Sequence, residues 1–451
     1  MTATAELSSL HPVVERSALL DRAIQLYAIA WILFLIGGFR MPWEPIPLDD
    51  EVTFSGRRQI VFTLGGALAL YRLVQVGRLE NRLSIHLSWV LFSALVLSSM
   101  LWTTDRTLTL KRSIVHAFGV LLLIAAVDSH RHPVQHFLRT ITIALGICAW
   151  ISLAQQYVWP PNTWSIPWRP GLAGLSGHPN VLGPCMQVGF LLSLSQRAQM
   201  PSHQFVLRML QLGMFVCLWK TDSMTSLTST IIGTGIFLAL STTSYRAGLI
   251  QIGVVFAAGV AMLIGTEELR ALFFASTGRD ETLSGRAELW DAVMRETQDR
   301  PLLGTGFGAF WYEGRGVELV TTWNPRQSHN SWIDVIAELG YSGLLAFLVV
   351  VPWRLWWSWL EGRGVRGTRQ RDCAAAIFAS AVALLAFASR SESFFLRMDK
   401  LQWFATVWGL ILLGNRGWNA PDYEFRHDRR RAKHDWAEGT RAPIASAPTQ
   451  S

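Results

Sequence analysis

Long apolar runs, repeated along most of the chain, constrain the fold more than any other feature of this sequence. About twelve of them approach or reach the roughly 17–25 residues that a helix needs to cross the hydrocarbon core of a bilayer. A helix pairs every backbone polar group within its own segment, so it is the default spanning element. We therefore predict an all-α polytopic membrane protein with about twelve transmembrane helices. The runs cover residues 22–39, 59–77, 84–102, 112–128, 136–158, 180–197, 205–219, 224–241, 247–266, 331–352, 373–390 and 400–415.

The composition favours the same class. Charged residues make up 16% of the chain, whereas soluble globular domains average about 25%. The 21 tryptophans fit the aromatic belts at the two membrane–water interfaces. We expect the first apolar run to stay as an anchor, because a long polar leader precedes it and no small-residue cleavage site follows.

Two basic segments explain most of the net charge of +8. One is a loop with Arg363, Arg366, Arg369 and Arg371, and the other is the tail around residues 426–433. Lys and Arg concentrate in cytoplasmic segments of membrane proteins, so we expect both segments and both termini inside. Anionic lipid headgroups, and not nucleic acid, are the expected partners of these charges.

These assignments divide the chain into five parts. Residues 1–21 form a cytoplasmic N-terminus, 22–266 hold helices 1–9, 267–330 form a large outer loop, 331–415 hold helices 10–12, and 416–451 form a basic, disordered cytoplasmic tail. A loop as long as 267–330 is usually functional when it is not disordered. Its run GRAELWDAVMRE has helical periodicity, so we expect an amphipathic helix across the outer face of the membrane.

The stretch SHNSWIDVIAELGYSG, residues 328–343, lies where the outer loop meets the tenth apolar run. Asn330 is a suitable N-cap for the helix that follows. This cap places His329 beside the free N–H groups of a helix N-terminus, where phosphates bind readily. A neutral imidazole there suits a general base near ambient pH. The alternative is an interfacial loop histidine without a function.

Gly340 and Gly343 follow His329 in the same run. Small residues three positions apart share a helix face and let a neighbouring helix approach closely. We therefore expect a rigid, tightly packed helix that presents His329 at its outer mouth.

Two arginines in the outer loops suit an anion. Arg169 lies in PWRPGLAGLSGHPN, whose glycines and prolines indicate a shaped loop, and His178 and Asn180 end that loop at the next apolar run. A guanidinium matches phosphate oxygens well. Arg286 precedes Trp290 by four residues, which places both on one helix face. The alternatives are an ordinary loop arginine at 169 and a solvated helix face at 286.

Other polar features carry weaker signals. Lys220, in WKTDSMTS, lies at an outer membrane edge, where snorkelling to the headgroups explains it without a function. The run GTGFGAF lacks GK[ST] and a preceding strand, so it does not indicate a nucleotide-binding loop. An acid–base pair among the carboxylates of the long loop stays an alternative, although their spacing is not distinctive. These carboxylates are Glu281, Glu288, Asp291, Glu313 and Glu318.

Three places in the sequence resemble one known family. His329-Asn330, nine residues, Gly340, two residues and Gly343 resemble the signature of O-antigen ligases and Wzy-type polysaccharide polymerases. LSGRAELW followed by PLLGTGFGAFW resembles the periplasmic loop of the exopolysaccharide-polymerase branch, and RPGLAGLSGHPNVLG resembles the earlier loop of the family. In organisation, the resemblance covers roughly residues 90–415.

The resemblance implies a GT-C-like glycosyltransferase in the bacterial inner membrane, with its active site facing the periplasm. Such enzymes act on glycans carried by undecaprenyl pyrophosphate. An acceptor hydroxyl attacks the anomeric carbon, the lipid pyrophosphate leaves and the configuration inverts, without a metal, a nucleotide sugar or another cofactor. The implied partners are the lipid-linked donor, a glycan or lipid acceptor, membrane lipid and, for a polymerase, a chain-length regulator.

The same resemblance assigns roles to residues of this chain. His329 is the base that activates the acceptor hydroxyl, and Arg169 and Arg286 hold the leaving pyrophosphate. The supporting residues are Asn180, Asn330, Gly340, Gly343, Trp290 and Lys220. One departure concerns the Ser-Arg or Ser-Lys pair near the eighth span of the family. This chain has Ser223-Met224 there, so Lys220 is the candidate replacement.

Three other functions remain alternatives. A ligase uses the same chemistry but passes the glycan to a lipid A core or another acceptor. A transporter or flippase of lipid-linked glycans needs no bond chemistry and predicts internal repeats and broken midplane helices, neither of which is clear here. A scaffold in a polysaccharide export complex needs no arginine–histidine constellation.

Overall fold

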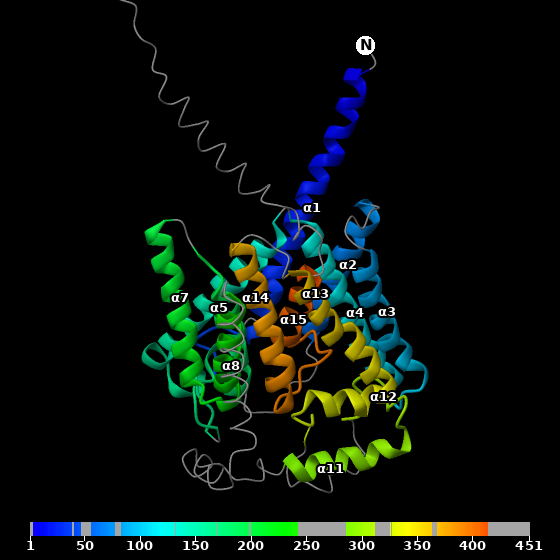
Figure 1. Cartoon of the computed structure of the whole chain (residues 1–451), viewed down its shortest axis with the longest axis vertical. Coiled ribbons are helices and arrows are strands. Elements are labelled where there is room, and N and C mark those ends of the chain that lie inside the picture. Colours follow the sequence, from blue (N-terminus) through cyan, green and yellow to red (C-terminus); the bar gives the residue numbers. More distant parts are fainter. Residues whose placement is uncertain are drawn as a thin grey trace, which may run out of the picture.

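The computed structural model shows a bundle of helices (Figure 1). It describes residues 3–37, 40–46, 56–76, 83–130, 132–167, 169–197, 200–241, 286–311, 325, 327–362 and 368–413. The labelled helices are α1 (Ala3–Gly37), α2 (Gly56–Val76), α3 (Leu83–Ser98), α4 (Arg106–Asp128), α5 (Pro133–Val158), α6 (Pro179–Ser193), α7 (Pro201–Lys220), α8 (Met224–Ser241), α11 (Arg286–Glu296), α12 (Ser331–Val350), α13 (Pro352–Gly362), α14 (Thr368–Val382) and α15 (Leu401–Leu413).

The apolar runs predicted from the sequence coincide with these helices, except for 247–266, which lies outside the described residues. By length and composition, 6 helical segments within the described ranges are long and apolar enough to cross a membrane. They are Leu19–Gly37, Arg106–Asp128, Pro133–Val158, Met224–Ser241, Ser331–Trp357 and Gln370–Arg390. This agrees with a polytopic membrane protein, while the count of twelve spans stays a prediction.

The core of the bundle lies where α4 packs against α1, α2, α3 and α15. Trp31 stacks on Phe404, with ring centroids 5.7 Å apart, and meets Phe62 edge-on at 4.5 Å. Phe347 stacks on Trp403 at 5.7 Å. Lipid tails are as apolar as these rings, so close packing and aromatic geometry, more than exclusion of water, hold helices together in a membrane.

The outer faces of several helices expose large apolar side chains. Leu64 and Val74 on α2, Phe215 on α7, and Trp353 and Trp357 on α13 are between 40% and 71% exposed. Such faces suit contact with lipid, and the two tryptophans suit an interfacial belt. These exposed faces are further support for a membrane-embedded bundle.

Helix α12 is broken at Gly340, which has φ 67° and ψ −171°. The loop after α11 inserts at the break and pairs with the opened backbone groups. Tyr341 N donates to Pro301 O at 2.8 Å, and Gly306 N donates to Glu338 O at 2.9 Å. Figure 1 shows the result: the first half of α12 lies across the lower end of the bundle, and the second half rises along it.

The break corrects the sequence-based interpretation of Gly340 and Gly343. A Cβ on Gly340 would lie 2.3 Å from the backbone of Leu302, so this glycine admits a loop and not a neighbouring helix. A Cβ on Gly343 would lie 2.1 Å from Cβ of Leu339, a residue of the same element. The prediction of one rigid helix was wrong because a kink of this kind depends on a distant segment, which helical spacing does not reveal.

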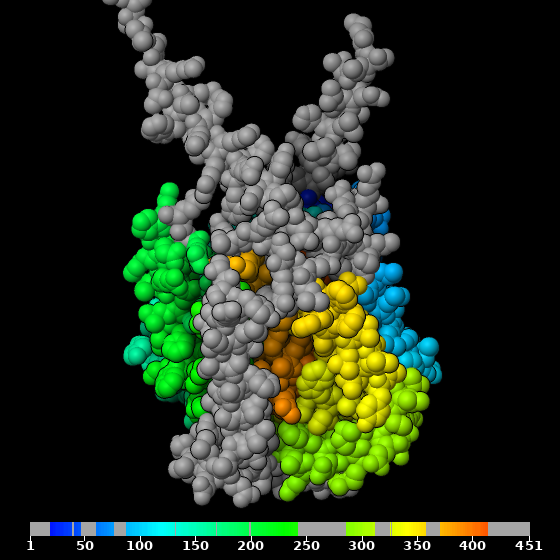
Figure 2. Space-filling view, in the orientation of Figure 1, coloured from blue at the N-terminus to red at the C-terminus, as the bar shows by residue number. Residues whose placement is uncertain are grey.

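Helix α11 confirms the amphipathic helix expected for the run GRAELWDAVMRE, while the place of this loop outside the membrane stays a prediction. Leu289 and Val293 are buried against Phe310 and Ala337, whereas the opposite face of α11 is exposed. α11 thereby packs on the first half of α12 at the end of the molecule opposite the N-terminus (Figure 1). In Figure 2 the lime surface of α11 and the yellow surface of α12 form one continuous face.

Candidate functional site

His329 follows a residue whose polar groups are all hydrogen-bonded. Ser328 is fully buried, and its N–H donates to Oδ1 of Asp334 at 3.0 Å. Its carbonyl oxygen accepts a hydrogen bond from Nε1 of Trp290 at 2.8 Å. Its hydroxyl donates to the Asn330 carbonyl at 2.7 Å and accepts from the Asn330 N–H at 3.0 Å. The turn that carries His329 is therefore fixed from three sides.

The backbone of His329 adopts the left-handed conformation, with φ 55°. This costs a non-glycine residue about 1 kcal/mol or more, and the Ser328 bonds hold the turn against it. Asn330 caps α12 as predicted, since its Oδ1 accepts from the N–H of Trp332 at 3.1 Å. The turn presents the imidazole beside the helix N-terminus, with Nδ1 at 3.4 Å from Nε2 of Gln327.

Arg169 lies in a loop that is docked on the turn between α7 and α8. Leu172 N donates to Lys220 O at 2.7 Å, and a Cβ on Gly171 would lie 2.3 Å from a backbone oxygen of the same turn. The guanidinium Nη2 donates to Oδ1 of Asn180 at 3.3 Å and to the carbonyl of Asp222 at 3.2 Å. Asn180 at the mouth of α6 thus orients Arg169, a contact that its place in the sequence did not reveal.

Arg286 and Trp290 lie on one face of α11, as the four-residue spacing predicted. Arg286 Nη1 donates to the carbonyl of Ser391 at 3.1 Å, and Trp290 reaches the carbonyl of Ser328. Helix α11 therefore joins the turn of His329 to the loop before α15. This loop, residues 391–400, is also tied to α12, because the hydroxyl of Ser331 donates to the carbonyl of Glu392 at 2.7 Å.

The loop before α15 adds two charged residues that the sequence analysis missed, Glu392 and Lys400. Arg169, Arg286 and Lys400 all lie within electrostatic reach of the buried Glu392 carboxyl. Arg286, Lys400 and His178 lie within reach of His329. The available signal was the sequence SESFFLRMDK, a short loop with charges of both signs between two apolar runs.

Charge and burial determine the protonation of this cluster. Burial, together with the positive charges of Arg286 and Lys400, lowers the pKa of His329 to about 4. Burial raises the pKa of Glu392 to about 7, against the opposing effect of the nearby cations. At neutral pH the imidazole is therefore neutral and has a lone pair for a proton.

Lys220 takes part in this arrangement through its backbone alone, as far as the described residues show. Its carbonyl supports the loop of Arg169, while its side chain is exposed at the end of α7. The run that matches the family's basic pair has Ser223 hydrogen-bonded to Ser226 at 2.9 Å. Lys400 supplies a cation within reach of His329, while Lys220 as a replacement for the basic residue near the eighth span stays a prediction.

The cluster of His329, Arg169, Arg286, Lys400 and Glu392, called the His329 cluster below, has an excess of positive charge. Fixed cations in a poorly hydrated site favour an anion, and a neutral imidazole beside it suits proton transfer. Over the described part of the chain, no group of three or more His, Cys, Asp or Glu side chains is arranged to hold a metal ion.

Comparison with known proteins gives two matches. Residues 209–348, which include the second half of α7, all of α8 and α11 and most of α12, match the family model described as O-antigen ligase. A stretch of 116 residues is 27% identical to the exopolysaccharide production protein ExoQ of Rhizobium meliloti (strain 1021). This second match covers 24% of the chain and 24% of ExoQ, so it spans about a quarter of that relative's length.

Proposed function

We propose that this chain, which belongs to the O-antigen ligase and Wzy-like family, polymerises lipid-linked oligosaccharide repeats at the periplasmic face of the inner membrane. One observation carries the proposal: two cations from separate segments, Arg286 and Lys400, act on the neutral imidazole of His329, and a third, Arg169, joins them around Glu392. The donor is a glycan on undecaprenyl pyrophosphate. The product is a longer lipid-linked polysaccharide of the exopolysaccharide or O-antigen type.

The reaction is a direct displacement at the anomeric carbon. His329 accepts the proton of an acceptor hydroxyl while the hydroxyl oxygen forms a bond to that carbon. The bond between this carbon and the pyrophosphate oxygen breaks, and its electron pair leaves with the lipid pyrophosphate. One bond forms opposite the bond that breaks, so the configuration inverts.

The three cations stabilise the charge that develops on the leaving group. Arg169 and Arg286 are each held by hydrogen bonds to the protein, so they are already oriented when the donor arrives. Preorganised donors of this kind contribute about 3–4 kcal/mol each to transition-state stabilisation in measured cases. Lys400 adds a third positive charge from the loop before α15.

The likeness to an exopolysaccharide production protein favours a polymerase. The description of the matching family model supports a ligase as the second candidate, with lipid A core or another molecule as acceptor. Both use the same donor and the same base. They differ only in the acceptor, which an assay with defined acceptors distinguishes.

The test uses purified full-length protein in nanodiscs with lipid-linked oligosaccharide from the host, and the products are resolved on a gel. We expect the wild type to make a ladder of longer lipid-linked glycans. His329→Ala should lose the ladder but still bind the donor, because the cations remain. His203→Ala, an exposed histidine on α7, is the matched control and should keep it.

Each other outcome has a definite meaning. A single shifted product that needs added lipid A core makes the protein a ligase. A folded wild-type protein that binds the donor but makes no product contradicts the enzymatic proposal and favours transport. A ladder that persists in His329→Ala contradicts the role of His329.

A further inference from the structure

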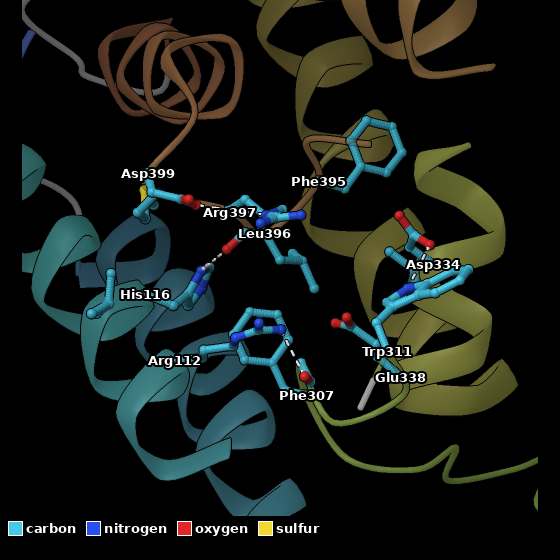
Figure 3. A pocket seen from close by; sticks show the side chains of 14 residues that line it. Arg112, His116, Phe307, Trp311, Asp334, Glu338, Phe395, Leu396, Arg397 and Asp399 are labelled. Carbon is cyan, nitrogen blue, oxygen red and sulfur yellow. Dashed lines mark hydrogen bonds and ion pairs between the residues drawn. The ribbon is translucent and has the colours of Figure 1, made fainter. Parts of the chain in front are cut away.

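A second polar cluster lies on the side of α12 that faces α4, and Figure 3 shows it around a cavity of about 40 Å³. α4 supplies Arg112 and His116, and the segment after α11 supplies Phe307 and Trp311. The first half of α12 supplies Asp334 and Glu338, and the loop before α15 supplies Arg397 and Asp399. These residues line what we call the α4–α12 cavity. The proposed reaction assigns no role to any of them.

The lining combines hydrogen-bond donors with acceptors, and its numbers of basic and acidic groups are nearly equal. Arg112 Nη1 donates to the carbonyl of Gly308 at 2.6 Å. Arg397 Nε lies 3.7 Å from Oδ1 of Asp399, and the Arg397 side chain keeps 34% of its surface exposed. With Asp334 and Glu338, two guanidinium groups face three carboxyl groups. The His329 cluster has instead three cations around Glu392, and the carboxylate of Asp222 lies 3.9 Å from one of them, Arg169.

His116 adds a buried polar atom without a partner. The residue is 1% exposed, and its Nδ1 lies 3.0 Å from the carbonyl oxygen of Leu396. A carbonyl oxygen only accepts, so Nδ1 carries the hydrogen, and Nε2 of the neutral ring is left with a lone pair. Nε2 has no hydrogen-bond partner among the described residues. A hydroxyl group is the kind of donor that this lone pair needs.

The chemistry of the lining selects one class of ligand. The three carboxyl groups disfavour binding of an anion, and the two guanidinium groups disfavour binding of a metal cation. An apolar ligand would remove these charged groups from water and offer no hydrogen bonds in place of those that they lose. A neutral polyhydroxylated molecule can donate to the carboxyl groups and to His116, accept from the arginines, and pack on the ring of Trp311. A glycan has all of these properties.

The size of the cavity defines which part of a glycan enters it. A water molecule needs about 10–15 Å³ of such space, so 40 Å³ has room for a few water molecules or for one hydroxyl-bearing group of that size. The ring would lie at the mouth, against Trp311 and the exposed side of Arg397. Figure 3 shows these two side chains on opposite sides of the opening between α4 and α12.

The cavity begins next to the proposed base. Asp334 lines the cavity, and its Oδ1 accepts from Nε1 of Trp311 at 3.2 Å and from the N–H of Ser328, the residue before His329. Glu338 lies one helical turn further, about 6 Å along the axis. A glycan held in this cavity therefore contacts Asp334, whose Oδ1 also fixes the turn that carries His329.

We propose that the α4–α12 cavity is a subsite for a neutral sugar of the acceptor glycan. This inference rests on the proposed function, since it concerns the glycan whose hydroxyl attacks the donor. It assigns the acceptor to the side of α12 that faces α4 and the donor pyrophosphate to the His329 cluster. Asp334 and Ser328 connect the two.

The test measures the kinetic constants for the acceptor and for the donor separately. The acceptor probe is the repeat oligosaccharide released from its lipid by mild acid, and the donor is the intact lipid-linked oligosaccharide. Steady-state rates are measured for full-length protein in nanodiscs, as wild type, Glu338→Gln and Arg397→Lys. Glu296→Gln, an exposed carboxyl on α11, is the matched control. Saturation-transfer NMR records binding of the released oligosaccharide to the wild type without donor.

We expect the KM for the acceptor to rise about tenfold in both cavity variants, as for the loss of one hydrogen bond to a charged group. The KM for the donor and the rate at saturating acceptor should change less than threefold in the same variants. An unchanged acceptor KM in both overturns the subsite. Equal rises in the KM for donor and for acceptor, together with a lower melting temperature, also overturn the subsite. They would show that the charged groups form a structural ion-pair network only.

The proposed function and the subsite fail in different ways. A wild type that makes no product contradicts the function, whereas NMR contact with the released oligosaccharide, lost in Glu338→Gln, still supports the subsite. A wild type that makes the ladder, with cavity variants that match Glu296→Gln in every constant, contradicts the subsite alone.

Discussion

The His329 cluster and the α4–α12 cavity flank the same half of α12 and share the loop before α15, yet their charges differ. The His329 cluster has Arg169, Arg286 and Lys400 around one carboxyl group. The cavity pairs two arginines with three carboxyl groups. An excess of fixed positive charge suits a pyrophosphate, and a balanced set of donors and acceptors suits a neutral sugar. The comparison shows how one short helix can carry a site for the leaving group and a subsite for the acceptor glycan.

The largest effect should come from removing a cation of the His329 cluster. Arg286→Gln should lower kcat by about 10²–10³-fold, because a preorganised donor to the developing charge is lost. Arg295→Gln, an exposed residue on the same helix, should leave kcat unchanged. Single-turnover rates with preloaded donor measure both. A similar loss in Arg295→Gln would show that the helix, and not the charge at 286, is responsible.

The second-largest effect should come from closing the break in α12, the helix that both regions flank. Gly340→Ala should destabilise the protein by about 2–4 kcal/mol, because its φ is positive and the new Cβ meets the Leu302 backbone. Gly177→Ala is a matched control, since Gly177 also has a positive φ but its nearest contact is a side-chain atom 3.8 Å away. Its cost should be only about 1 kcal/mol. Thermal unfolding in detergent compares the two, and equal losses would contradict the inserted loop.

Asp334 links the His329 cluster to the α4–α12 cavity, so its removal should affect both of them. Asp334→Ala leaves the Ser328 N–H and the Trp311 indole without their acceptor, at a cost of about 1–3 kcal/mol. We expect kcat to fall and the acceptor KM to rise together. Asp334→Asn keeps a carbonyl acceptor for both donors and should recover most of kcat. A loss of kcat alone in Asp334→Ala would show that the regions act independently.

The pH dependence should give the smallest effect. The pKa of His329 lies at about 4, below its ordinary value, so the base is neutral above this pH. The acid limb of kcat/KM that belongs to His329 should therefore lie at about pH 4, and not at 6.5. Protonation of Glu392, whose pKa is about 7, gives a separate change at higher pH. Lys400→Met removes one of the charges that lower this pKa and should move the acid limb upward. An acid limb that stays in place would exclude this electrostatic effect.

The residues at the mouths of apolar runs were largely predictable from the sequence. Asn330 as a cap and Asn180 at the end of its loop follow from local rules, since caps and loop ends involve neighbouring residues. Trp290 on the face of Arg286 follows from helical spacing. The local pattern thus located these three residues, which help to position the His329 cluster, before any contact was known.

The features that the sequence did not reveal depend on distant segments. The break at Gly340 exists because residues 301–306 pair with it, and helical spacing alone predicted a continuous span. Lys400 and Glu392 belong to a loop far along the chain, and only the fold brings them to His329. The α4–α12 cavity joins four segments for the same reason, and no motif marks it.

The most direct test of the account is the binding of undecaprenyl pyrophosphate, the proposed leaving group, to full-length protein in nanodiscs. Wild type, Arg286→Gln and Arg397→Gln are compared by their dissociation constants. The account predicts weaker binding by about tenfold or more in Arg286→Gln, since a charged hydrogen bond is lost, and little change in Arg397→Gln. Weaker binding in Arg397→Gln, with Arg286→Gln unchanged, would contradict the assignment of the pyrophosphate to the His329 cluster.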